Sequence, residues 1–154
     1  MHKTYKNLIS EVLPQIREIF PWDLADLRET QEIVIVDIRE PEEVALGSIQ
    51  GALHVPRGML EAACDWGYSE TIPHLVAARD KPVVLACRSG NRSALAAFTL
   101  QLMGYQHVYS LKTGIRGWND AELPLVTPQG EQVDVDEAEH LLSPPVKPEQ
   151  LAPR

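Results

Sequence analysis

Three short apolar runs, separated by segments of helical character, constrain the fold of this chain most strongly. They are EIVIVD, KPVVLAC and HVYSL, at positions 32–37, 81–87 and 107–111. None shows the alternation of apolar and polar residues that marks a strand with one face in water. Such strands are typical of a parallel sheet that is buried on both faces. We therefore expect an α/β fold whose parallel central sheet is flanked by helices on both faces.

The two ends of the chain differ from this central region. Apolar residues recur at steps of three and four from Tyr5 to Phe20, which predicts an amphipathic helical cap over residues 1–20. Pro14 removes one backbone hydrogen bond and should kink or divide that helix. Residues 126–154 are acidic and rich in proline, so we expect a partly disordered tail with one brief helix in DVDEAEHLL. The domain between the two ends would cover residues 21–125.

Charge and composition exclude several classes of protein. The formal net charge is −8, from 14 basic and 22 acidic residues, whereas a general nucleic-acid binder needs a surplus of lysine and arginine. The chain has no apolar run long enough to span a membrane, and charges interrupt its N-terminus where a signal peptide would be apolar. Two cysteines do not make a disulfide framework. We expect a cytoplasmic protein that binds neither nucleic acid nor membranes.

The loop that follows the run KPVVLAC combines a cysteine with residues suited to binding an anion. Cys87 ends the predicted strand, and ligands of α/β sheets bind beyond the carboxyl ends of strands. Gly90 and Asn91 tolerate the backbone angles of a tight turn, which can direct successive N–H groups inward. The helix that starts near Ser93 adds its own free N–H groups. Although a lone cysteine after a strand is usually structural, this loop favours a thiolate nucleophile.

The length of the loop distinguishes between two kinds of reaction that a cysteine loop can support. Cysteine-dependent phosphatases use a C-x5-R loop, whereas Cys87 and Arg92 form the shorter pattern C-x4-R. The smaller loop suits a single extra sulfur atom on the cysteine. A persulfide carries its negative charge on that outer sulfur, where the N–H groups would converge.

At this point the sequence resembles the rhodanese family of sulfurtransferases. Four stretches carry the resemblance, in the family's order: VDIREPEEVALGSIQGALHVP, RGMLEAA, CRSGNRSALAAFTLQLMGY and LKTGIRGW. The chain departs from the family where Ser48 follows Gly47 and where Thr113 precedes Gly114. The resemblance implies a double-displacement reaction in which Cys87 takes the outer sulfur of a donor such as thiosulfate, or a glutathione or protein persulfide. A thiol or cyanide then removes that sulfur, with no metal or organic cofactor.

The candidate site residues follow from the loop and from the resemblance. Cys87 is the predicted nucleophile, and the predicted substrate-binding residues are those of the loop, Arg88, Ser89, Gly90, Asn91, Arg92 and Ser93. Arg88 should face the mouth of the pocket, whereas Arg92 could bind the substrate or support the loop. We interpret Asp37 and Arg39 as scaffold and Cys64 as a core residue, with a Cys64–Cys87 disulfide as the alternative.

Three other functions stay open at this point. The first is a phosphatase. The second is a non-catalytic binding module that keeps the fold, although such relatives tend to lack the cysteine that this chain retains. The third is a sulfur relay, in which the partner that accepts sulfur is a carrier protein instead of a small thiol.

Overall fold

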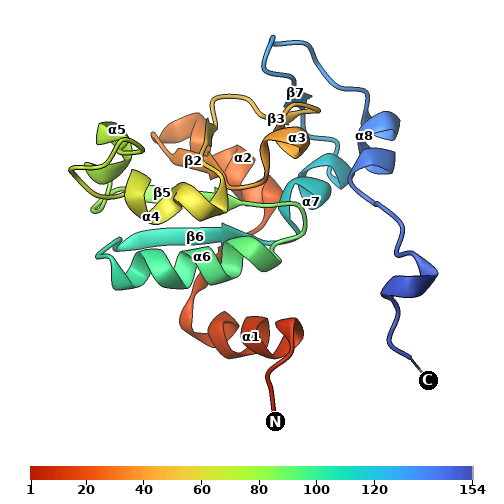
Figure 1. Ribbon diagram of the computed structural model, residues 1–154. Coiled ribbons are helices and arrows are strands. Elements are labelled where there is room, and N and C mark those ends of the chain that lie inside the picture. The colour runs from red at the N-terminus through yellow and green to blue at the C-terminus, as the bar shows by residue number, and fades with distance from the viewer. Residues whose placement is uncertain (154) are drawn as a thin grey trace.

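The computed structural model describes residues 1–153 and contains a five-stranded, fully parallel sheet (Figure 1). The predicted α/β fold with a parallel central sheet is confirmed. Its strands run in the spatial order β1 (Arg17–Ile19), β6 (His107–Leu111), β5 (Pro82–Ala86), β2 (Val34–Asp37) and β4 (Leu53–His54). A separate antiparallel pair joins β3 (Ser48–Ile49) to β7 (Leu125–Val126).

Both faces of the sheet are covered by helices, which explains why its strands are apolar throughout. Along β2, Val34 and Val36 face one core and Ile35 faces the other. The first core includes residues of α4 (Leu60–Ala63), α5 (Pro73–Val76) and α6 (Asn91–Leu102). The second includes residues of α2 (Pro21–Thr30), α7 (Gly114–Asp120) and α8 (Val135–Leu141). The remaining short helices are α3 (Pro41–Val44), η1 (Leu13–Gln15), η2 (Arg57–Met59) and η3 (Pro148–Gln150).

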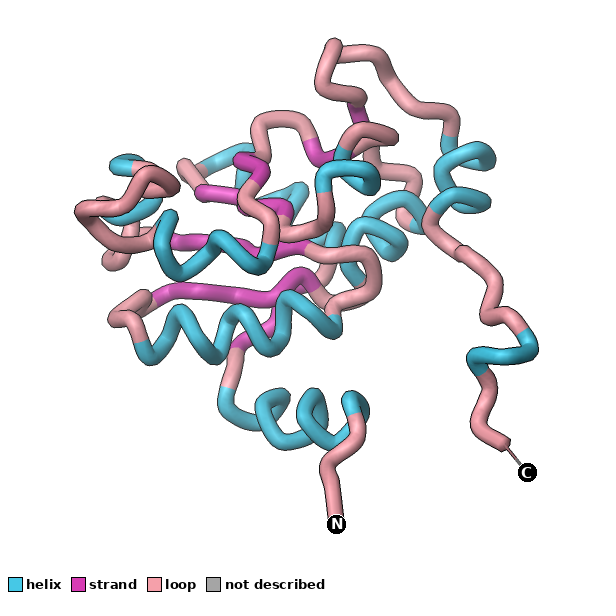
Figure 2. The backbone as a smooth tube through the Cα atoms, in the orientation of Figure 1, coloured by secondary structure: helices cyan, strands magenta, loops and turns pink. Residues whose placement is uncertain are grey.

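The N-terminal segment is only partly the helix that its periodicity predicts. Helix α1 (Tyr5–Val12) packs against α6, and Figure 2 shows that the chain then leaves the helix for the sheet. Pro14 lies in η1, and β1 follows it. The prediction of helix up to Phe20 is therefore wrong for residues 17–19. Because Ile19 is buried and pairs with Leu111 of β6, this short run is more stable as an edge strand than as a last helical turn.

The C-terminal segment contains the predicted brief helix. Asp134 caps α8 by accepting a hydrogen bond from the N–H of Glu137 at 3.0 Å, and Ala138 and Leu142 are buried in the second core. Residues 143–153 are exposed and contain only η3. Within residues 1–153, no helix combines the length and the apolar character that crossing a membrane requires.

Candidate active site

The Cys87 loop turns the chain from the end of β5 into the start of α6. Only Arg88, Ser89 and Gly90 lie between Cys87 and the first residue of the helix. Gly90 has φ +98°, and a Cβ atom there would lie 3.3 Å from the carbonyl oxygen of Leu111. A glycine therefore suits this position for both its backbone angle and its lack of a side chain.

The sulfur of Cys87 is buried, but its surroundings are polar. Its Sγ accepts hydrogen bonds from the N–H groups of Gly90 at 3.1 Å and Ser93 at 3.3 Å. The hydroxyl of Ser93 lies 3.4 Å from Sγ and 2.7 Å from the hydroxyl of Ser110. Two amide donors at the start of a helix stabilise a negative charge on sulfur. The loop therefore places two N–H donors within hydrogen-bond distance of the sulfur.

Helix α7 supports the loop through two backbone hydrogen bonds. The N–H of Ile115 donates to the carbonyl of Cys87 at 2.8 Å, and the N–H of Arg116 donates to that of Arg88 at 2.9 Å. A Cβ atom on Gly114 would lie 2.5 Å from both carbonyl oxygens. The approach of α7 therefore requires glycine at this position. Thr113, where the family usually has glycine, adopts φ +66°.

Arg88 of the loop and Arg92 in the first turn of α6 have different environments. Arg92 forms a two-pronged salt bridge to Glu43 of α3, with nitrogen–oxygen distances of 2.8 and 3.0 Å. This contact favours a supporting role for Arg92, one of its two predicted alternatives. Among residues 1–153, no carboxylate forms a salt bridge with Arg88. Arg88 instead lines a cavity beside the loop.

The Arg92–Glu43 pair should make the free energy of unfolding depend on pH in the acid range. Burial alone would raise the pKa of Glu43, but the hydrogen bonds and the charge of Arg92 outweigh it and lower that pKa. A lowered carboxyl pKa stabilises the fold above the pKa of the unfolded chain, and the effect is lost as pH falls through the folded value. We expect Glu43→Gln to lower the free energy of unfolding by about 1 kcal/mol at neutral pH, after allowance for solvent screening.

Urea unfolding of both proteins at neutral pH and at about pH 3 checks this expectation. The difference between wild type and Glu43→Gln should be smaller at the lower pH, because this stabilisation is lost as pH falls through the lowered pKa of Glu43. A difference of the same size at both pH values would contradict the role given to the Glu43 charge.

Asp37 and Arg39 form a buried pair between the end of β2 and the start of α3. Their side chains are 1% and 2% exposed. The Arg39 guanidinium donates to both carboxylate oxygens of Asp37 and, at 2.7 Å, to the carbonyl of Gly47. Ser48, the residue that departs from the family pattern, donates to Asp37 at 2.6 Å. Because the two buried side chains bind each other and the backbone within this network, the geometry agrees with a scaffold role.

Cys64 lies in the core. It is fully buried, it forms no disulfide with Cys87, and burial raises the pKa of its thiol. These features agree with the interpretation of Cys64 as a packing residue.

Tyr5 of α1 belongs to the electrostatic surroundings of Cys87, although no local pattern in the chain predicts it there. Burial raises the pKa of the Tyr5 phenol, the negative charge of Cys87 adds to this effect, and Arg92 and Arg88 oppose it. Tyr5 and Ile9 also line a surface hollow with Asn91 of the loop. The N-terminal helix therefore forms part of the rim around the site.

Comparison with known proteins identifies the family. The model of the rhodanese-like domain matches residues 21–121. The chain belongs to the rhodanese-like domain family. The thiosulfate sulfurtransferase GlpE of Actinobacillus succinogenes is 31% identical over 116 residues, which cover 73% of this chain and 93% of that protein. A sulfurtransferase of Allochromatium vinosum is 44% identical over 52 residues, covering 34% of this chain and 49% of that protein.

Solved structures show the same rhodanese fold. A Rhodopseudomonas palustris protein of unknown function, described as a possible tyrosine phosphatase, is 34% identical with a TM-score of 0.74. The match covers 81% of this chain and 96% of that one. A rhodanese-related protein of Thermoplasma volcanium is 28% identical with a TM-score of 0.58, covering 71% and 97% of the two chains.

The predicted site residues are contiguous in the chain, and the structure shows what each part of the loop contacts. Gly90 and Ser93 contact the sulfur, Arg92 binds Glu43, and Arg88 is among the residues that line a cavity. Within residues 1–153, histidine, cysteine and carboxylate side chains form no group of three that could hold a metal ion. The roles of the loop residues in catalysis stay predictions.

Proposed function

We propose that the protein is a sulfurtransferase that carries a sulfane sulfur as a persulfide on Cys87. The observation that supports this most directly is the pair of N–H groups, from Gly90 and Ser93, that point at Sγ. The same donors can stabilise the thiolate before the reaction and the charge of the persulfide after it. The relatives named sulfurtransferases support the same reaction class.

The first half of the reaction loads sulfur onto the enzyme. The Cys87 thiolate attacks the outer sulfur of thiosulfate, a new sulfur–sulfur bond forms, and the old one breaks with its electron pair on sulfite. Arg88, which lies next to Cys87 and has no salt-bridge partner within residues 1–153, attracts the donor's negative charge.

The second half of the reaction removes the sulfur from the enzyme. A thiolate or cyanide attacks the outer sulfur of the persulfide and restores the Cys87 thiolate. Two displacements with a covalent intermediate replace one more difficult transfer. A carrier protein that accepts the sulfur in place of a small thiol is the alternative for this step.

Phosphatase activity is the second candidate, because one structural relative is described as a possible tyrosine phosphatase. Two observations favour sulfur transfer over it. The loop is one residue shorter than C-x5-R, and Glu43 already holds both terminal nitrogens of Arg92. An arginine held in this way has fewer donors left to bind the oxygens of a phosphate group.

Intact-mass spectrometry tests the proposed intermediate. After brief incubation with thiosulfate, the protein should gain the mass of one sulfur atom, and cyanide should remove it. The gain should persist in Cys64→Ala, because Cys64 is buried in the core. An unchanged mass of the wild-type protein, or a gain that requires Cys64, would contradict the proposal.

A further inference from the structure

Helix α1 lies next to the candidate site although it precedes the part of the chain that matches the family. The family match begins at residue 21, whereas α1 covers Tyr5–Val12. The helix packs against α6, and Figure 1 shows the first turn of α1 at the same end as the first turn of α6. Ile9 attaches the helix there, because its side chain is buried. The start of α1 therefore lies close to the Cys87 loop.

Side chains spaced four residues apart on α1 face the segment around the sulfur. Tyr5, Ile9 and Leu13 line a surface hollow together with Asn91, the first residue of α6. Ile9 and Leu13 also line a second hollow with Gly90, whose N–H donates to Sγ of Cys87. Because residues four apart share one face of a helix, this face of α1 borders the loop.

The Tyr5 phenol lies within electrostatic reach of the charged groups around the sulfur. Burial raises the pKa of the phenol most strongly, the negative charge of Cys87 adds to this effect, and Arg92 and Arg88 oppose it. The hydrogen bond from Glu43 raises the pKa of Arg92, and the charges of Cys87 and Tyr5 contribute in the same direction. With its raised pKa, the phenol keeps its proton at neutral pH and can donate a hydrogen bond.

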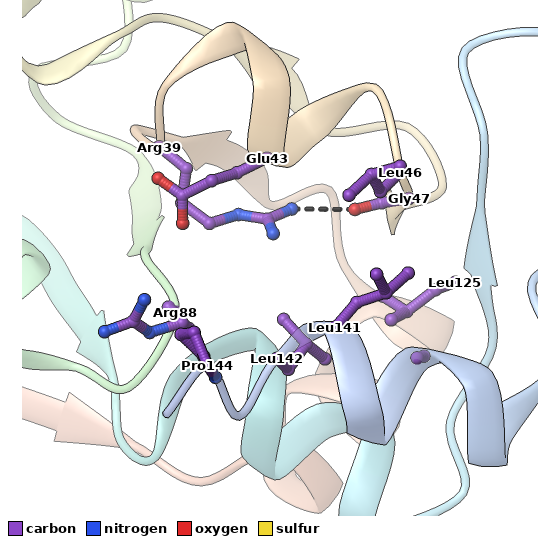
Figure 3. Close-up of a pocket in the computed structure, with 10 residues that line it drawn as sticks. Arg39, Glu43, Leu46, Gly47, Arg88, Leu125, Leu141, Leu142 and Pro144 are labelled. Atoms are coloured by element: carbon purple, nitrogen blue, oxygen red, sulfur yellow. Dashed lines mark hydrogen bonds between the residues drawn. The ribbon is translucent and has the colours of Figure 1, made fainter. Parts of the chain in front are cut away.

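Two donors beside the loop are free to bind an anion. Within residues 1–153, no hydrogen bond uses the Tyr5 hydroxyl, and no salt bridge neutralises Arg88. Figure 3 shows the Arg88 guanidinium pointing away from Leu141 and Leu142, which belong to the apolar wall of the cavity that Arg88 lines. A neutral donor and a positive charge near Cys87 can therefore bind the same anion.

We propose that the Tyr5 hydroxyl donates a hydrogen bond to an oxygen of the thiosulfate donor at the mouth of the Cys87 loop. The inference rests on the proposed sulfurtransferase function and adds a donor-binding residue from outside the family match. Arg88 supplies positive charge, and Tyr5 supplies a directed donor. As the Cys87 thiolate bonds to the outer sulfur, the old sulfur–sulfur bond breaks with its electron pair on sulfite. The Tyr5 proton stays on its oxygen, so atoms and charge balance.

The two half-reactions separate this role from a structural one. In a double displacement, kcat/KM for thiosulfate reports on the loading of Cys87, and kcat/KM for cyanide reports on the unloading. Sulfite has left before the unloading begins, so Tyr5 has no oxygen to bind in that step. Tyr5→Phe should lower kcat/KM for thiosulfate by about tenfold and leave kcat/KM for cyanide within about twofold, as expected for one lost hydrogen bond to a charged group.

The matched control is Tyr68→Phe, in the loop between α4 and α5, where the side chain is 57% exposed. It should change neither value. Equal losses in the two half-reactions of Tyr5→Phe, or no loss in the loading, would overturn the inference and leave the proposed function intact. If thiosulfate transferred no sulfur to Cys87 in the wild-type protein, the proposed function itself would be wrong.

A double-mutant cycle tests whether α1 acts through the hydroxyl. Ile9→Ala removes the buried contact that attaches the helix, so it should lower kcat/KM for thiosulfate when Tyr5 is present. The same change should have little further effect in Tyr5→Phe, because the two residues then act as one unit. An equal loss in both backgrounds would show that α1 supports the loop without the hydroxyl, and would overturn the assignment of Tyr5.

Discussion

Replacing Cys87 by serine is expected to lower the turnover of thiosulfate and cyanide by at least about 10³-fold, as loss of the nucleophile does in other covalent enzymes. Serine nearly matches cysteine in size and can still accept the hydrogen bonds from Gly90 and Ser93. The loop should therefore keep its shape, while the hydroxyl cannot carry a sulfur atom as a persulfide does. Release of sulfite and formation of thiocyanate measure the loss.

Two comparisons test whether the loss is specific to Cys87 and to sulfur transfer. Cys64→Ala removes the other cysteine and should retain turnover. The wild-type protein should not hydrolyse an aryl phosphate at a rate that Cys87→Ser abolishes. If it did, the same loop would be acting as a phosphatase, and the assignment to sulfur transfer would be wrong.

Replacing Arg39 by alanine is expected to cause the largest loss of stability, about 3–5 kcal/mol of the free energy of unfolding. Arg39 is 2% exposed and supplies two donors to the Asp37 carboxylate and one to the carbonyl of Gly47. Without it, a buried negative charge keeps only its remaining contacts, among them the hydroxyl of Ser48. Urea unfolding at neutral pH measures the change.

Arg57→Ala is the matched control for this variant. Arg57 forms its salt bridge with Glu61 at 2.8 Å, but the two side chains are 30% and 48% exposed. Exposed pairs contribute about 1 kcal/mol or less, so the control should be much milder. A similar loss in both variants would show that the burial of the Asp37–Arg39 pair has no special effect.

The sequence predicted the sheet well because both of its faces are buried. Runs such as Val83 to Ala86 can be apolar throughout only where helices cover each side, and such runs are visible without knowledge of the contacts. Strand β1 was missed for the opposite reason. Its three residues, Arg17, Glu18 and Ile19, continue a helical pattern and become a strand only through pairing with β6.

The part of the candidate site whose residues are neighbours in the sequence could be predicted. Cys87 and the residues up to Ser93 form one continuous segment, the loop and the first turn of α6, so their grouping followed from the chain itself. The partner of Arg92 is 49 residues away at Glu43, and Tyr5 comes into the electrostatic surroundings of Cys87 because α1 packs against α6. Leu141 and Leu142 likewise come to line a cavity with Arg88 only because the C-terminal segment packs on α7. These contacts depend on tertiary packing, which no local pattern specifies.

The hydrogen bonds from Ile115 and Arg116 to the carbonyls of the loop have a practical consequence for protein engineering. Transplanting residues 87–93 alone onto the end of a strand in another parallel sheet would leave those carbonyls without their donors, and the turn that directs the N–H groups of Gly90 and Ser93 at the sulfur would lose this support. A functional transplant must also carry the segment around Gly114, whose missing side chain lets the second helix come so close. The smallest portable unit is thus two separated pieces of chain, joined by a strand that keeps them in register.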